Sequence, residues 1–298
     1  MSVPTDHNIE AASVEAFLKA YREGVGKLLS STSISELELS QRVASQFDNT
    51  ASGIPLFAGF DASLDGAGLA RIGFGLEKIL YTHVSDIFHN FVAALSGDET
   101  PEEALSRLVR HTLKGDVAYF ENLSRERSIP ADRLAFFGNF LVRPIRQRAR
   151  HVLESAYDLD QWHYSYCPVC GLWPQMARLE EEFGQRHLWC IGCTGQWSFP
   201  RMRCPFCLED NQEKLGYLTV EGWEGYRIQT CDNCHHYLKT RDERQPEPKS
   251  VSDFDIEYLG TTVLDAAATR EGYCNDFIGL TAFNAKDPPL SRTYRQKL

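Results

Sequence analysis

Eight of the nine cysteines form four Cys-x-x-Cys pairs within one short stretch, and this pattern constrains the fold more than any other feature of the chain. A Cys-x-x-Cys turn places two thiolates on one side of a tight loop, which is half of a tetrahedral four-sulfur shell. Gaps of 19, 10 and 23 residues separate successive pairs. Two pairs roughly 15 to 20 residues apart make a complete metal site, so the middle gap is the linker between two sites.

The spacing therefore predicts two consecutive four-cysteine sites. We expect two metal ions per chain, of iron or of zinc, because both metals accept an all-thiolate tetrahedral shell. The expected ligands are Cys167, Cys170, Cys190 and Cys193 in the first site, and Cys204, Cys207, Cys231 and Cys234 in the second.

Three kinds of chemistry are compatible with these cysteines. Zinc in a closed four-thiolate shell has no open coordination position and would only hold the fold together. Iron in the same shell can exchange an electron. Cys-Pro-x-Cys also occurs in thiol–disulfide exchange, but that chemistry uses one pair at the start of a helix in a βαβ unit. Four pairs on turns between short β-segments favour metal binding.

The start of the chain does not resemble a signal peptide, because Met1–Glu10 contains Asp6 and Glu10 and no apolar core. No part of the sequence approaches the ~18 to 20 consecutive apolar residues that span a membrane. A cytoplasmic chain keeps its thiols reduced, which favours metal ligation over disulfides. We therefore expect a soluble cytoplasmic protein that makes no contact with a membrane.

The charge balance argues against a nucleic-acid partner. The chain has a net charge of −10, and residues 161–240 carry seven Lys and Arg against nine Asp and Glu. Each divalent ion bound by four thiolates would add about −2. Binding of phosphates needs a basic face that releases counterions, and no such face is visible in the sequence.

Hydrophobic periodicity predicts that the first half of the chain is helical. Apolar residues recur at the helical period in several stretches, which we interpret as a packed helical core rather than a cofactor groove. Thr100-Pro101-Glu102-Glu103 supplies an N-cap, a proline in the first turn and a capping-box glutamate, and Ser33 with Glu36 forms a similar box. The expected helices cover residues 14–29, 33–47, 69–95, 101–113 and 134–152, the last with a kink at Pro144.

The cysteine region resembles a degenerate internal repeat of two small β-modules. Each half opens with Cys-Pro-x-Cys and closes with a second pair followed by an aromatic residue, Trp197 or Tyr237. Sheets this small cannot bury enough apolar surface to fold alone, so the metal would supply the missing core. Gly171 suits a turn with positive φ, whereas Leu208 takes that place in the second half.

These patterns predict an α+β chain with a helical N-terminal domain, two small four-cysteine modules and a C-terminal helix. That helix has its apolar period over residues 256–267, and Gly272 ends it. We expect the N-terminal helices to survive the loss of any cysteine pair, because they have an apolar core of their own. The expected boundaries are 1–160, 161–202, 203–245 and 246–298, the last holding a Pro-rich linker, the helix and a tail.

The sequence shows no catalytic constellation. It contains no phosphate-binding glycine loop, no HExxH or GxSxG motif and no convincing pair of carboxylates. Cys274 stands outside the four pairs and is interpreted as a packing residue. His235 and His236 adjoin a shell that cysteine already completes. We therefore expect a protein without enzymatic activity.

From Cys167 to Tyr273, about a third of the chain, the sequence resembles the FdhE family of formate dehydrogenase accessory proteins. In the helical half only residues 134–150, with Arg143-Pro144, are similar. The resemblance rests on the order and spacing of these segments: Cys167-Pro-Val-Cys-Gly171, Leu188-Trp-Cys-Ile-Gly-Cys193 with Trp197, Arg203-Cys-Pro-Phe-Cys207, Cys231-Asp-Asn-Cys-His-His-Tyr-Leu-Lys239, and Asp255-Ile-Glu-Tyr-Leu-Gly-Thr-Thr-Val-Leu-Asp265 through Glu271-Gly-Tyr273.

The resemblance implies two rubredoxin-like or zinc-ribbon-like modules with bound iron or zinc, and a cytoplasmic location. It implies a non-enzymatic role in the maturation of a molybdenum- or tungsten-dependent formate dehydrogenase, through binding of the catalytic subunit of that enzyme. Two other classes of function stay open. One is a rubredoxin-like iron protein that passes electrons to a partner, and the other is a zinc-ribbon protein that binds nucleic acid.

Four tryptophans crowd the metal modules and allow two interpretations. Exposed aromatic residues are enriched at protein interfaces, so they could face a partner. Modules of this size have little other core, which favours packing within the sheets. The residues are Trp173, Trp189, Trp197 and Trp223.

Overall fold

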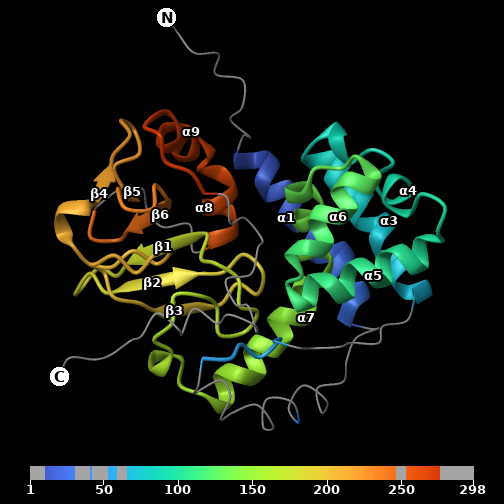
Figure 1. The fold of residues 1–298 in the computed structure, drawn as a ribbon, viewed down its shortest axis with the longest axis horizontal. Coiled ribbons are helices and arrows are strands. Elements are labelled where there is room, and N and C mark those ends of the chain that lie inside the picture. The colour runs from blue at the N-terminus through green and yellow to red at the C-terminus, as the bar shows by residue number, and fades with distance from the viewer. Residues whose placement is uncertain (1–10, 31–40, 42–52, 59–65, 246–252, 276–298) are drawn as a thin grey trace, which may run out of the picture.

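The computed structural model describes residues 11–30, 41, 53–58, 66–245 and 253–275, and it confirms the α+β fold class. Helices form the N-terminal part and one sheet the C-terminal part (Figure 1). The predicted helix over residues 33–47 lies outside the described residues. The helices are α1 (Ala11–Ser30), α3 (Gly66–His83), η1 (Asp86–Phe88), α4 (Phe91–Ser96), α5 (Pro101–Lys114), α6 (Val117–Arg127), α7 (Ala131–Ala156), η2 (Leu159–Gln161), η3 (Gln212–Lys214), α8 (Phe254–Gly260) and α9 (Thr262–Arg270).

The helix predicted over residues 69–95 is interrupted in the structure. α3 ends at His83, the short η1 follows, and α4 begins only after Asn90, whose φ of 55° is left-handed. The hydroxyl of Ser85 accepts a hydrogen bond from the amide of Ile87 and so caps η1. This local bond gives the backbone an alternative to a continued helix. The apolar period alone did not reveal the interruption.

Helix α5 begins where the sequence predicts. The hydroxyl of Thr100 accepts from the amide of Glu103, and the carboxylate of Glu103 accepts from the amide of Thr100, which completes a capping box. A cap of this kind stabilises a helix by about 1 kcal/mol. The following α6 was not predicted, because it is mostly polar and its buried apolar residues are only Phe120 and Leu123.

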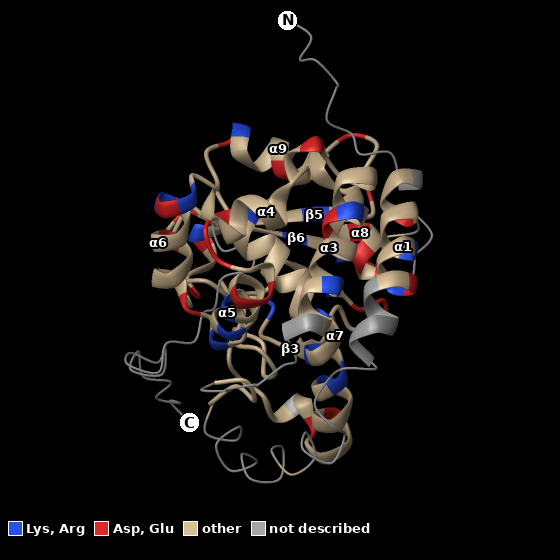
Figure 2. Cartoon of the chain, turned by 90° about the vertical axis from the view of Figure 1, so that its right-hand side faces the viewer, with Lys and Arg blue, Asp and Glu red and all other residues tan. Residues whose placement is uncertain are grey.

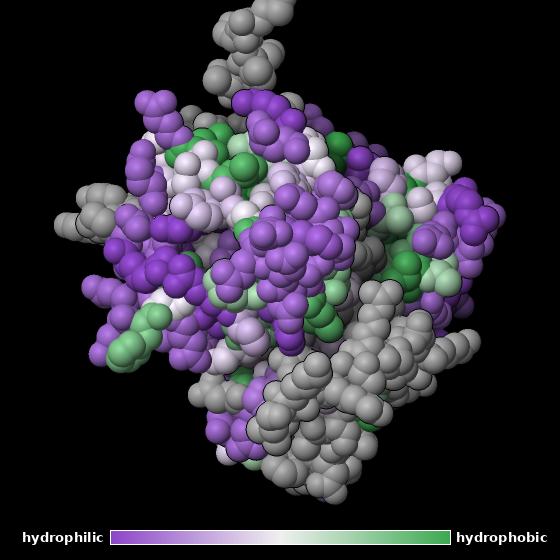
Figure 3. Space-filling model, turned by 60° about the vertical axis from the view of Figure 1, so that its left-hand side comes forward, coloured by the Kyte–Doolittle hydropathy of each residue, from purple (hydrophilic) through white to green (hydrophobic). Residues whose placement is uncertain are grey.

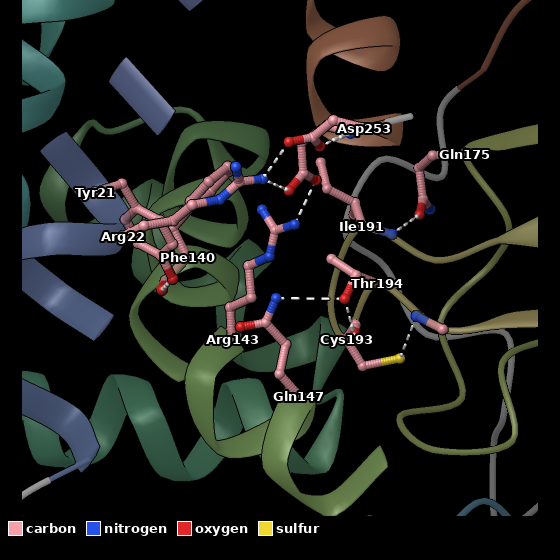
Figure 4. A network of polar contacts seen from close by, with 12 residues as sticks. Tyr21, Arg22, Phe140, Arg143, Gln147, Gln175, Ile191, Cys193, Thr194 and Asp253 are labelled. Carbon is pink, nitrogen blue, oxygen red and sulfur yellow. Dashed lines mark hydrogen bonds and ion pairs between the residues drawn. The ribbon is translucent and has the colours of Figure 1, made fainter. Parts of the chain in front are cut away.

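Pro144 lies inside α7 and links this helix to α1. A proline has no backbone N–H, so the carbonyl of Phe140, four residues earlier, loses its helical donor. The hydroxyl of Tyr21 in α1 donates to that carbonyl at 2.6 Å (Figure 4). The proline therefore creates an acceptor in the core, and α1 supplies the donor.

The two cysteine modules share one six-stranded sheet in the order β3-β2-β1-β6-β5-β4. Each module contributes three antiparallel strands, and the modules join where β1 and β6 run parallel, with Met176 opposite Lys239. The shared sheet buries more apolar surface than two separate small sheets would. The strands are β1 (Met176–Leu179), β2 (Arg186–Trp189), β3 (Gln196–Ser198), β4 (Leu215–Leu218), β5 (Tyr226–Cys231) and β6 (Tyr237–Asp242).

Helices α8 and α9 pack on one face of this sheet. The buried ammonium of Lys239 donates to the carbonyl of Tyr258 and to the carboxylate of Asp265, each at 2.8 Å. The sequence predicted a single helix here, but the chain turns at Thr261, whose hydroxyl donates to the carbonyl of Glu257 at 2.7 Å. The turn lets both short helices contact the sheet.

The helical part and the sheet share one continuous hydrophobic core. The amides of Leu56 and Phe57 donate to carbonyls of the first cysteine turn at 2.9 Å. On the other side, α1 lies beside α8 (Figure 1), and Arg22 pairs with Asp253 at 2.8 Å. These contacts join the helical part to the cysteine modules, so we no longer expect the helices to stay folded independently of both metal sites. The boundary at residue 160 stays a prediction.

The described helices carry charges of mixed sign. Figure 2 shows Lys and Arg interspersed with Asp and Glu over the helical side. Among the described residues, no helix is long and apolar enough to span a membrane. The mixed charge on this side does not form the basic stripe that a nucleic-acid-binding surface requires.

Glu257 should make the stability of the α8–sheet contact depend on pH. Burial raises the pKa of its carboxyl group from 4.5 to about 7, although the charge of Arg241 opposes this rise. Between these two pKa values the folded state holds a proton that the unfolded state has lost. The free energy of unfolding should therefore fall as pH rises from 4.5 to about 7, by up to about 3 kcal/mol.

Urea unfolding at pH 5 and pH 8 measures this contribution. A Glu257→Gln variant cannot ionise at this position and should show a smaller difference between the two pH values than the natural chain. Equal differences in the two proteins would contradict the assignment.

Candidate metal centres

The four cysteine turns share one backbone geometry. In each, the amide of the first cysteine donates to a carbonyl five residues later, and the amide four residues later donates back to the carbonyl of that cysteine. These two bonds close the turn and direct both thiols to the same side. The bonds from the first cysteine's amide to the carbonyl five residues later are Cys167 to Leu172 at 2.9 Å, Cys190 to Gly195 at 3.0 Å, Cys204 to Glu209 at 2.9 Å and Cys231 to His236 at 3.1 Å.

The residue after the second cysteine is left-handed in every turn. Its φ is 68° at Gly171, 58° at Thr194, 63° at Leu208 and 56° at His235. Only glycine adopts this conformation without steric cost, which is about 1–2 kcal/mol for other residues. The third turn therefore has the same geometry as the first, although Leu208 stands where the first turn has Gly171. Three of the four turns carry this strain.

The structure brings the eight predicted cysteines together in two clusters, grouped as the sequence predicts. Within each cluster the four sulfur atoms lie within 4.8 Å of one another. The shortest Sγ–Sγ distances are 3.3 Å in the first cluster, between Cys170 and Cys190, and 3.6 Å in the second, between Cys207 and Cys231. Sulfurs about 2.3 Å from a tetrahedral zinc ion are about 3.8 Å apart. Each cluster therefore fits one ion.

The first cluster is buried. Cys167, Cys190 and Cys193 have no exposed surface, and Cys170 is 6% exposed. Burial raises the pKa of the Cys167 and Cys193 thiols. Four thiols in such a place cannot all ionise unless a cation replaces their protons, and a metal ion with four thiolates meets this requirement.

Two arginines of α7 lie beside the first cluster. A Cβ built on Gly192 would be 3.1 Å from Nη1 of Arg146 and 3.3 Å from Sγ of Cys170, so the guanidinium and the thiol are close neighbours. Burial opposes ionisation of Cys170, but hydrogen bonds from the other thiols and the charge of Arg146 lower its pKa overall. Arg150 donates to the carbonyl of Thr194 at 3.5 Å. Both positive charges offset the roughly −2 of a divalent ion with four thiolates.

The sequence analysis did not identify these arginines as part of the site. Arg143, Arg146 and Arg150 are spaced so that they lie on one face of α7. Arg146 has no exposed surface, and it donates to Asn139 and, at 2.7 Å, to the carbonyl of Thr112. The available signal was the spacing of these three arginines, which places them on the helix face that also carries buried apolar residues.

The second turn of the first cluster is fixed from two sides (Figure 4). The side-chain amide nitrogen of Gln147 in α7 donates to the hydroxyl of Thr194 at 3.3 Å, and the carbonyl oxygen of the Gln175 side chain accepts from the backbone amide of Ile191 at 3.1 Å. The amide of Gly195 donates to Sγ of Cys193 at 3.4 Å. These bonds couple the first cluster to the helical part.

The second cluster is closer to solvent. Cys204 and Cys231 are buried, but Cys207 and Cys234 are partly exposed. The side-chain amide of Asn233 donates to Sγ of Cys207 at 3.5 Å. The buried guanidinium of Arg186 donates to the carbonyl of Arg203, which precedes Cys204. Burial lowers the pKa of Arg186 to about 9, while the charge of Cys204 opposes the change.

Comparison with known proteins points to one family. None of the protein-family models matches the chain. An FdhE homolog of Aquifex aeolicus is 28% identical over 151 residues, which are 50% of this chain and 52% of that protein. An FdhE homolog of Shewanella baltica is 31% identical over 112 residues, or 37% of this chain and 36% of that protein. The crystal structure of the FdhE protein from Pseudomonas aeruginosa matches with a TM-score of 0.55 and 18% identity, over 95% of this chain and 99% of that one.

These matches support the resemblance of this chain to the FdhE family. The sequence matches span about half of the Aquifex relative and about a third of the Shewanella relative. The structural match extends over nearly the whole chain, and at its low identity it shows that the fold is shared with the Pseudomonas FdhE protein.

The four tryptophans near the clusters and the ninth cysteine are all packed or paired with neighbouring residues. Trp189 and Trp197 are 2% and 1% exposed, which confirms the packing interpretation for these two. Trp173 and Trp223 are partly buried beside aromatic neighbours. The backbone of Cys274 pairs with the second module, since its amide donates to the carbonyl of His235 at 2.8 Å.

The different burial of the clusters should appear in their rates of metal loss. A chelator approaches the partly exposed second cluster more easily than the buried first cluster. We expect a chromogenic chelator to remove metal in two phases, about one ion per chain in each. A Cys207→Ser variant should lack the fast phase. Loss of both ions in a single phase from the natural chain would contradict this difference.

Proposed function

We propose that this protein is a non-enzymatic, metal-binding accessory protein for a molybdenum- or tungsten-dependent formate dehydrogenase. In this proposal it acts in the cytoplasm and binds the catalytic subunit of that enzyme before the enzyme is complete. The observation that carries the proposal is the pair of four-cysteine clusters on one shared sheet, in a chain that is similar to FdhE homologs over part of its length.

The chemistry of the clusters supports a role in binding rather than catalysis. In each cluster four thiolates would fill the tetrahedral shell of an iron or zinc ion, and no coordination position would be left for a substrate. The ions would instead hold the turns, strands and adjacent surfaces in a fixed arrangement. A fixed surface suits recognition of another protein, because little conformational entropy is lost when it binds.

Deletion of the gene tests the proposal in the cell. Formate dehydrogenase activity should fall, while the amount of catalytic subunit stays largely unchanged, and an affinity-tagged copy of this protein should co-purify with that subunit. Expression of the natural chain from a plasmid should restore the activity. Unchanged activity in the deletion strain, together with the absence of co-purification, would refute the proposal.

The exposure of the second cluster favours a second candidate, an iron protein that passes electrons to a partner. Electron transfer is faster when the metal lies near the surface, and Cys207 and Cys234 are both partly exposed. Iron in this shell would give a visible colour and a reversible potential. A colourless protein that contains only zinc would exclude this candidate.

A further inference from the structure

A pocket of about 220 Å³ lies beside the second cluster. Its walls come from strands β1, β2, β4, β5 and β6 and from residues 201–206, and the cluster cysteines Cys204 and Cys231 form part of it. Four arginines line the pocket, and no acidic residue does. We call it the arginine pocket. The four are Arg186, Arg201, Arg203 and Arg227.

The four arginines of the pocket outnumber their carboxylate partners, and the second cluster with a divalent ion bound would add about −2 beside them. Arg203 and Arg227 pair with Asp210 at 3.0 Å and Asp242 at 2.7 Å. Among the described residues, no carboxylate lies within ion-pair distance of Arg186 or Arg201. Two arginines of the pocket therefore lack a carboxylate, although the chain as a whole has a net charge of −10.

Arg186 is held in place although it lacks a carboxylate. It is 2% exposed, and its guanidinium donates to the side chain of Gln229 at 2.9 Å and to the carbonyls of Pro200 and Arg203. Its Nε–H is buried and has no hydrogen-bond partner. Burial of a cation without a carboxylate partner is costly; the charge of Cys204 offsets part of this cost, and a carboxylate in the pocket would offset more.

The remainder of the arginine pocket is largely apolar. Leu238 and Leu179 are buried in its wall, whereas Tyr217 and Met202 are 58% and 49% exposed. Tyr217 belongs to β4, the edge strand of the sheet, and the guanidinium of Arg227 lies over its ring. In Figure 3, where the left-hand side of Figure 1 comes forward, hydrophobic atoms form small patches between hydrophilic ones. The pocket combines a small apolar surface with two arginines that have no carboxylate partner.

We propose that the arginine pocket binds a segment of the catalytic subunit in which a large apolar side chain lies next to a carboxylate. This inference rests on the proposed function. The carboxylate would face Arg186 and Arg201, and the apolar side chain would contact Tyr217 and Leu238. The volume suits one such side chain and is below the roughly 300–1,000 Å³ of pockets for cofactor-sized ligands. A largely apolar wall suits a protein segment better than a phosphate backbone.

The test measures the affinity of full-length, metal-loaded protein for the purified catalytic subunit of formate dehydrogenase. Arg201→Glu and Tyr217→Ser change exposed side chains, so each variant should keep its fold and its metal content. Each should weaken binding by about tenfold or more. Raising the salt concentration should weaken binding of the natural chain more than that of Arg201→Glu, because the variant has lost an attractive charge.

Two matched variants control for general surface effects. Arg125→Glu in α6 and Phe74→Ser in α3 alter an exposed arginine and an exposed aromatic residue away from the pocket, and both should bind as the natural chain does. Normal affinity of both pocket variants would overturn the inference and leave the proposed function intact. Failure of the natural chain to bind the subunit would overturn both. Binding of a single-stranded RNA oligonucleotide that Arg201→Glu abolishes would assign the pocket to nucleic acid and overturn the inference.

Discussion

A Cys190→Ser variant should lose the metal ion of the first cluster and, with it, the folded sheet. Cys190 has no exposed surface, and the cluster joins β2, β1 and α7. A structural four-thiolate site contributes on the order of 10 kcal/mol, which is similar to the ~5–15 kcal/mol total stability of a domain. Far-UV circular dichroism should show loss of strand signal and a less cooperative helical transition, and elemental analysis should show the missing ion.

The matched change in the second cluster should have a smaller effect. Cys207 is partly exposed, and its cluster lies away from α7, so Cys207→Ser should remove one ion while the first cluster and the helical part remain folded. The sequence suggested that the helices survive the loss of either cluster, and the shared core changes this expectation for the first one. A fully folded Cys190→Ser protein with two bound ions would contradict this account.

Replacing Arg143 by methionine should destabilise the chain by about 3–5 kcal/mol. Arg143 in α7 forms an ion pair with Asp255 in α8, and their side chains are 2% and 6% exposed. Without Arg143, the charge of Asp255 would be buried with only the half-exposed Arg22 nearby, at 3.0 Å. The midpoint of urea unfolding should fall accordingly, because the contact between the helical part and α8 is weakened.

A double variant separates the loss of the ion pair from the loss of packing. Arg143→Met combined with Asp255→Leu leaves no unpaired charge, so it should regain much of the stability that Arg143→Met loses. Arg133→Met, which alters a partly exposed arginine near the start of the same helix, should cost much less. If Arg143→Met and the double variant unfolded at the same urea concentration, the ion pair would not be the cause.

Features that depend on residues close in sequence could be predicted well. Each cysteine turn is closed by bonds within six residues, so the spacing of the pairs was enough to group the eight ligands. The capping box from Thr100 to Glu103 fixed the start of α5 in the same way. In both cases the side chains that signal the structure are also those that make the local bonds.

Features that depend on distant residues could not be predicted. The pairing of β1 with β6 joins Met176 to Lys239, and nothing in either strand indicates its partner. The arginine pocket forms only when β2 and β5 bring Arg186 and Arg227 together, although the local composition around the cysteines is acidic overall. The role of Arg146 depends on the docking of a cysteine turn against α7. These contacts require the three-dimensional fold.

Elemental analysis of protein purified without air, combined with its absorption spectrum, tests the central claim most directly. We expect two ions of iron or zinc per chain, and eight of the nine thiols should resist a thiol reagent until the protein is unfolded. Bound iron would give thiolate-to-iron charge-transfer absorption in the visible range, whereas bound zinc would give no visible absorption. A chain with one ion or none, whose cluster thiols react freely while it remains folded, would contradict the account.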